Sequence, residues 1–111
     1  MPVFITDFNK KNSKNFSRAR RYGVLVPVTN KQCYPDDWEE KVQDMAAEAA
    51  SVLKDFNFKE DYLLLAGDPA AIAVCVATVS AMAATRDEPV AFKCLKWDRK
   101  EEGYYIIEIE V

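Results

Sequence analysis

The residues best suited to chemistry in this sequence lie directly after predicted strands. Asp68 and Asp98 each follow an apolar run, while Asn30 follows another such run and Arg99 is next to Asp98. If the three strands are parallel, their carboxyl ends bring these residues to the edge where α/β sheets bind ligands. Two carboxylates there can hold Mg²⁺ or act as an acid/base pair on a nucleotide. The opposing interpretation is local, since Asp68 also suits a helix cap and Asp98 a turn.

Several common chemistries are excluded by composition. The chain has no histidine, which removes Ser-His-Asp and Cys-His mechanisms and every His-ligated metal site. Cys33, Cys75 and Cys94 are too far apart for a zinc site. Only Gly67 stands at a strand-to-helix junction, so the sequence has neither a dinucleotide fingerprint nor a P-loop. We therefore expect no metal and no cofactor, and a binding protein in preference to an enzyme.

A basic segment, defined here as residues 9–22, is the second candidate for function. It contains six cations and no acid in a chain of net charge -3, so the other residues carry -9. The candidate partner-binding residues are Lys10, Lys11, Lys14, Phe16, Arg18, Arg20, Arg21 and Tyr22. Because the segment lacks apolar periodicity, we predict a loop or arm that binds a host or viral protein, or a short single-stranded nucleic acid. The alternative is a solvated segment whose charge balances the acidic first helix.

The stretch from Pro69 to Ala84 is a predicted helix without a single charge. One side is bulky and the other is lined with alanine, so neither is an obvious solvent-facing surface. We expect a homodimer that buries the bulky stripe, which consists of Ile72, Val76, Val79 and Met82. If the bulky stripe packs on the sheet instead, the alanine stripe would form a closer, flatter interface. The stretch is too short to span a membrane, and we expect a cytoplasmic protein.

The elements that would position these residues form one domain over residues 1–111. A helix is predicted over residues 36–55, because its apolar residues have helical spacing. A second helix is predicted over residues 68–85, because Asp68 suits the cap and Pro69 the first helical position. Strands are predicted at 3–5, 23–28, 61–66, 90–97 and 104–111. Two successive strand-helix-strand units give three parallel strands, and the last strand returns antiparallel as a hairpin. The fold class is thus a small three-layer Rossmann-like α/β domain.

The C-terminal half carries a family resemblance. Its pattern is the run from Asp61 to Pro69, a helix of small residues, Leu95 to Arg99, and a final strand that contains tyrosine. From Tyr62 to Val111 the chain resembles small accessory proteins of tailed phages. The resemblance implies a protein that acts inside a bacterial host, and it brings no catalytic or binding residues.

Three functional hypotheses follow from these observations. The first is a non-enzymatic phage-type accessory protein that binds a host or viral macromolecule through its basic segment. The second is a nucleotide-binding or nucleotide-cleaving domain that uses Asp68 and Asp98. The third is a structural subunit whose task is assembly.

Overall fold

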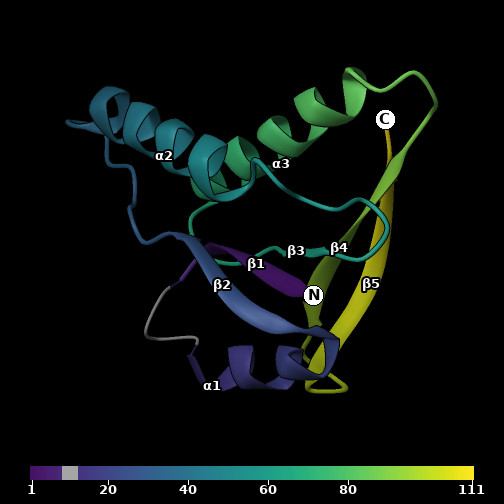
Figure 1. Cartoon of the computed structure of the whole chain (residues 1–111). Helices are drawn as coiled ribbons and strands as arrows, with labels where there is room; N and C mark the ends of the chain where they lie inside the picture. Colours follow the sequence, from purple (N-terminus) through teal and green to yellow (C-terminus); the bar gives the residue numbers. More distant parts are fainter. Residues whose placement is uncertain (9–12) are drawn as a thin grey trace.

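The protein is a five-stranded mixed sheet with helices on both faces (Figure 1). The computed structural model describes residues 1–8 and 13–111. The elements are β1 (Pro2–Asp7), α1 (Ser13–Phe16), the 3-10 helix η2 (Ser17–Tyr22), β2 (Val24–Thr29), α2 (Trp38–Val52), β3 (Tyr62–Leu64), α3 (Pro69–Ala84), β4 (Ala91–Asp98) and β5 (Gly103–Glu110). The strand order is β2-β1-β3-β4-β5, in which only β5 runs antiparallel to its neighbour. The predicted α/β class, with parallel strands and a C-terminal antiparallel hairpin, is confirmed.

The first strand is the element whose place the sequence did not predict. β1 lies between β2 and β3 and is parallel to both, so four strands are parallel instead of three. Val3 and Ile5 pack toward α1 and η2, whereas Phe4 packs toward α2 and α3. Because these side chains are covered on both faces, even this short apolar run forms a central strand.

The two long helices cover one face of the sheet, and α1 with η2 covers the other (Figure 1). On the first face, Ala49 and Leu53 join Cys75 and Val79 over the sheet in the larger core cluster. α3 begins as predicted, because the Asp68 carboxylate accepts the Ala70 amide at 2.9 Å and Pro69 takes the first helical position. The observed helices start and end within three residues of the predicted bounds.

The prediction of a loop for the basic segment is wrong over residues 13–22. These residues form α1 and η2, and Phe16 and Ala19 are buried at 2% and 0% exposure. Phe16 also packs against Phe8, with ring centroids 5.3 Å apart. Two inward residues three positions apart define one side of a helical turn, which is too short a pattern to show apolar periodicity. The segment is therefore a packed part of the fold.

The predicted dimer stripe on α3 is corrected by the burial pattern. The residues that face the sheet are Ala71, Cys75, Val79 and Ala83, which repeat every four positions. Val79 is fully buried, and Val76 and Met82 pack against the same core. Of the bulky stripe, Val79 is therefore buried, whereas Ile72, Val76 and Met82 are only partly buried. The exposed positions of α3 are mostly alanines: Ala73, Ala77, Ala81 and Ala84.

Truncation of Phe16 tests whether the basic segment is part of the core. We predict that Phe16→Ala lowers the free energy of unfolding by about 3–5 kcal/mol, as expected for loss of a buried phenyl ring. Lys14→Ala, at an exposed site one turn away or less, should change it by no more than about 0.5 kcal/mol. Urea denaturation of both variants measures these values. Equal, small effects would show that the segment does not pack on the sheet.

Candidate functional site

The carboxyl ends of β1 and β3 meet at a buried carboxylate. Asp7 ends β1 and is 1% exposed, and its Oδ2 accepts the backbone amide of Asp68 at 2.9 Å. Its Oδ1 is the one buried side-chain polar atom without a hydrogen-bond partner among the described residues. Burial raises the pKa of Asp7 above its ordinary value, while the bond from Asp68 acts in the opposite direction. Sequence reasoning missed this residue, although it is an acid that follows the apolar run of residues 3–5 after a single threonine.

Gly67 lies directly against the Asp7 carboxylate. Its φ of +85° belongs to the left-handed region that favours glycine, and an added Cβ would overlap the Asp7 carboxylate. Next to it, the Thr6 hydroxyl donates to the Ala66 carbonyl at 2.7 Å and accepts the Ala66 amide at 2.9 Å. The strand order reverses direction between β1 and β3, which is where open α/β sheets bind ligands. Here the chain's own backbone and side chains occupy that position.

Both carboxylate oxygens of Asp68 already accept a backbone amide. Its Oδ1 caps α3 through the Ala70 amide, and its Oδ2 accepts the Cys33 amide at 2.8 Å. The N-terminus of α3 is therefore satisfied by a negative charge of the chain itself, which disfavours a bound phosphate. Burial, followed by the charges of Asp68 and Asp37, raises the pKa of Cys33 and makes its thiol a poor nucleophile.

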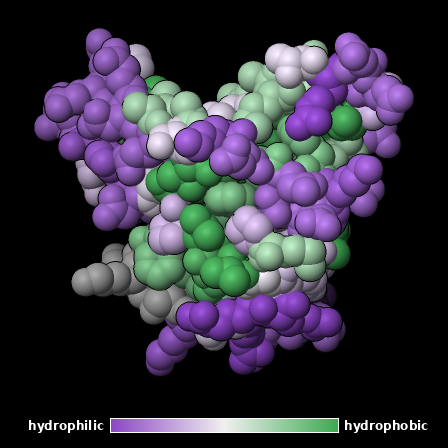
Figure 2. Space-filling model, viewed as in Figure 1, coloured by the Kyte–Doolittle hydropathy of each residue, from purple (hydrophilic) through white to green (hydrophobic). Residues whose placement is uncertain are grey.

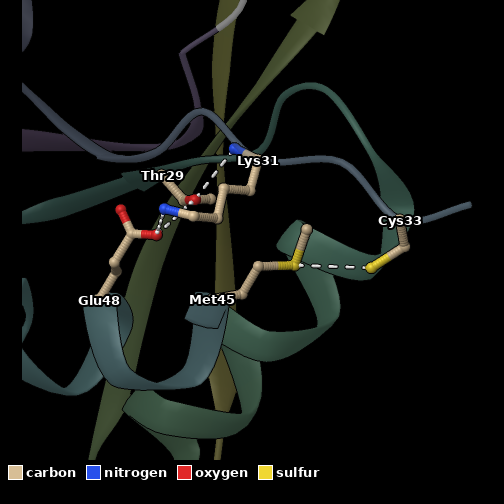
Figure 3. Close-up of polar contacts among 5 residues, drawn as sticks. All are labelled: Thr29, Lys31, Cys33, Met45 and Glu48. Carbon is tan, nitrogen blue, oxygen red and sulfur yellow. Dashed lines mark hydrogen bonds and ion pairs between the residues drawn. The ribbon is translucent and has the colours of Figure 1, made fainter. Parts of the chain in front are cut away.

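A polar cluster lies at the carboxyl end of β2 (Figure 3). The Lys31 ammonium contacts Glu48 Oε1 of α2 at 2.6 Å, and the Thr29 hydroxyl donates to the same oxygen at 3.3 Å. The Lys31 amide donates to the Thr29 hydroxyl at 3.1 Å, and the bond to Glu48 raises the pKa of Lys31. Below them, the sulfur atoms of Cys33 and Met45 are 3.9 Å apart. The cluster fixes the loop after β2 onto α2 and leaves its one cation already paired.

The predicted ligand edge is divided between two grooves. Asn30, with Asp7 and Glu48, lines a groove of about 650 Å³ beside β2. Asp98 and Arg99, with Trp97 and others, line a separate groove of about 680 Å³ at the end of β4. Asp98 Oδ1 accepts the Lys100 amide at 3.0 Å, as a turn residue does. The structure therefore does not gather Asn30, Asp68, Asp98 and Arg99 around one cavity.

The outer side of α1 and η2 carries four exposed cations. We call this surface the basic face: Lys14, Arg18, Arg20 and Arg21, all of which are exposed. Figure 2 shows a hydrophilic band where α1 lies in Figure 1. Arg18 donates to the Glu102 carbonyl at 2.8 Å and lies 3.9 Å from the Glu102 carboxylate, and Arg21 stacks over Tyr22. The basic face is thus partly anchored to the β4–β5 turn.

Two predicted contact residues of the basic segment point inward. Phe16 is in the core, and Tyr22 is half-buried, with its hydroxyl donating to the Tyr104 carbonyl at 3.3 Å. The Tyr22 ring also packs edge-on against Tyr62, with centroids 5.3 Å apart. Neither aromatic ring is therefore available to stack on a base. The predicted contacts Lys10 and Lys11 lie outside the described residues.

In the part of the chain that the structure describes, no group of three or more acidic or cysteine side chains is placed to hold a metal ion. Nor is any described helix both long and apolar enough to cross a membrane.

The strand order defines a small, doubly wound α/β protein with an appended antiparallel strand. The chain belongs to the Phage Pam3 gp32-like protein family, whose model matches residues 3–111. The phage resemblance seen in the C-terminal half thus extends over nearly the whole chain. No curated protein and no solved structure matches it.

The buried Asp7 carboxyl predicts a pH effect on stability. Because its pKa is raised, the folded state binds a proton more tightly than the unfolded state, so ionisation costs stability as the pH rises above about 4. Asp7→Asn retains an oxygen to accept the Asp68 amide. We predict that its free energy of unfolding increases relative to that of the wild type as the pH rises from 4 to 7. Urea denaturation across that range measures the difference. A difference that shrinks with rising pH would contradict the assignment.

Proposed function

We propose that this phage protein works by binding an acidic protein of the host or the phage through its basic face. The observation that supports this proposal most is a set of four exposed cations on an element that Phe16 and Ala19 fix to the sheet. A fixed surface loses less conformational entropy on binding than a mobile arm does. The remainder of the chain carries a large negative charge, so the basic face is a distinct positive patch.

An acidic protein fits this surface better than a nucleic acid does. Single-stranded nucleic acids are usually held by aromatic side chains that stack on bases, and Phe16 and Tyr22 are committed to intramolecular packing. The excess negative charge elsewhere on the chain would also repel a long polyanion. A compact acidic surface avoids that repulsion because it contacts the basic face alone.

The nucleotide hypothesis receives less support from the geometry. It requires Asp68 and Asp98 to act on one ligand, yet both oxygens of Asp68 accept backbone amides. Asp98 lines a groove to which Asp68 does not contribute. The assembly hypothesis, a structural subunit whose task is assembly, does not account for the four exposed cations of the basic face.

Neutralisation of the basic face tests the proposal. The protein is used as bait in lysate from infected host cells, and the captured acidic protein is then titrated in purified form. We predict that Arg20→Gln with Arg21→Gln weakens binding by about 0.5–2 kcal/mol, or roughly 2- to 30-fold in Kd, the sum expected for two exposed ion pairs. The affinity should also fall as salt is added.

The matched control removes the same charge elsewhere. Lys54→Gln with Lys59→Gln changes two exposed lysines outside the basic face and should leave Kd unchanged. If both double variants lost affinity equally, the effect would come from net charge, and the proposal of a specific binding surface would be contradicted. Capture that disappears after nuclease treatment would identify a nucleic acid as the partner.

A further inference from the structure

The two edges of the sheet differ in how open they are to another strand. At one edge, β2 contains the exposed Pro27, which has no amide to donate. At the other edge, β5 is eight residues long and, within the described part of the chain, pairs with β4 alone (Figure 1). Natural sheets usually shorten, bulge or charge an exposed edge to prevent pairing. In β5, the charged residues that could discourage pairing are Glu108 and Glu110, which lie near one end of the strand.

The backbone groups along the outer side of β5 follow from the ladder to β4. Val111 donates its amide to the carbonyl of Val90, the residue directly opposite. In an antiparallel ladder the direction alternates with every residue, so the amides of Ile106, Glu108 and Glu110 point away from β4. Among the described residues, the outer side of β5 is contacted near its start, where Tyr22 donates to the Tyr104 carbonyl. From Ile106 onward no hydrogen bond to other described residues uses these groups.

Side-chain exposure along β5 is consistent with a missing neighbour. Tyr105 and Ile106 are 44% and 46% exposed, and being adjacent they lie on opposite faces of the sheet. A strand added at this edge would cover both of them together. Exposed β-branched and aromatic residues in mid-strand are the features that favour cross-strand pairing.

We propose that a second copy of this chain adds to this edge, with β5 antiparallel to β5 about a two-fold axis near Ile107. In this register the partner strands pair over Tyr104 to Glu110, with Glu108 opposite Ile106 and Glu110 opposite Tyr104. Moving the axis to Ile106 would set Glu110 opposite Glu102, and moving it to Glu108 would set the two Glu108 side chains opposite each other. Like charges directly opposite destabilise a sheet, which selects the central register.

The resulting assembly is a continuous ten-stranded sheet. Because the axis is perpendicular to the sheet, both copies of α2 and α3 lie on one side and both basic faces lie on the other. The dimer thereby presents two positive patches in the same direction, a geometry that permits simultaneous contact with two acidic sites. The edge pairing itself does not depend on what the basic face binds.

Sedimentation equilibrium of the full chain at about 50 µM tests the pairing, since association is favoured by protein concentration. The wild type should have twice the 12.6 kDa mass of the chain. Ile106→Pro removes an outward amide without breaking a bond to β4 and should give the monomer mass. Ile106→Thr retains the amide and a β-branched side chain, so it should remain dimeric.

Each outcome decides the proposal. A wild type with the monomer mass would overturn it, and so would an Ile106→Pro variant that remains dimeric. A circular dichroism melt shows whether Ile106→Pro is folded, and Glu108→Pro serves as the second variant if it is not. Independently, the Ile106 amide of the wild type should exchange with solvent more slowly as the concentration rises, and concentration-independent exchange would contradict the pairing. A wild-type chain that dimerises but captures no acidic protein would count against the proposed role of the basic face and leave the edge pairing standing.

Discussion

The Asp7 carboxylate accepts the amide of Asp68 while Gly67 lies directly against it, and this contact sets the geometry of one whole end of the molecule. It joins the end of β1 to the start of α3 across 61 positions of sequence. Asp68 is then held where its two oxygens bind the amides of Cys33 and Ala70, so the loop after β2 joins the same point. One buried carboxylate therefore organises the edge where related sheet topologies hold ligands. Because the chain's own residues fill the junction between β1 and β3, a binding function is better sought on the outer surfaces.

Strong local patterns made most of the fold predictable. The continuous apolar run at β3, the cap and proline at the start of α3, and the alternation of Ile107 and Ile109 with acids in β5 each indicate a single structure. The side of α3 that packs on the sheet was not predictable. Its bulky and alanine stripes are both apolar, so hydropathy does not indicate which of them is buried. The sheet and α2 select the stripe that contains Cys75 and Val79.

The candidate site was less predictable, for reasons that are specific to its residues. The charges of the basic face were evident from composition, but the inward position of Phe16 depends on a core that forms from distant strands. Asp7 is enclosed by Gly67 and Asp68, which are distant in sequence. Lys31 forms an ion pair with Glu48, 17 residues away. Pairings at such separations leave no periodic signal in a single sequence, whereas capping by Asp68 involves its immediate neighbours and does.

The central claim is that α1 and η2 form a fixed basic surface that contacts an acidic partner. Amide hydrogen exchange over residues 13–23, measured with and without the captured partner, tests it most directly. In the free protein, the Gly23 amide, which donates to Arg20, should exchange slowly, and binding should slow exchange further across η2 while α2 is unaffected. Exchange at the rate of an unfolded chain in the free protein, or no change across η2 on binding, would contradict the account.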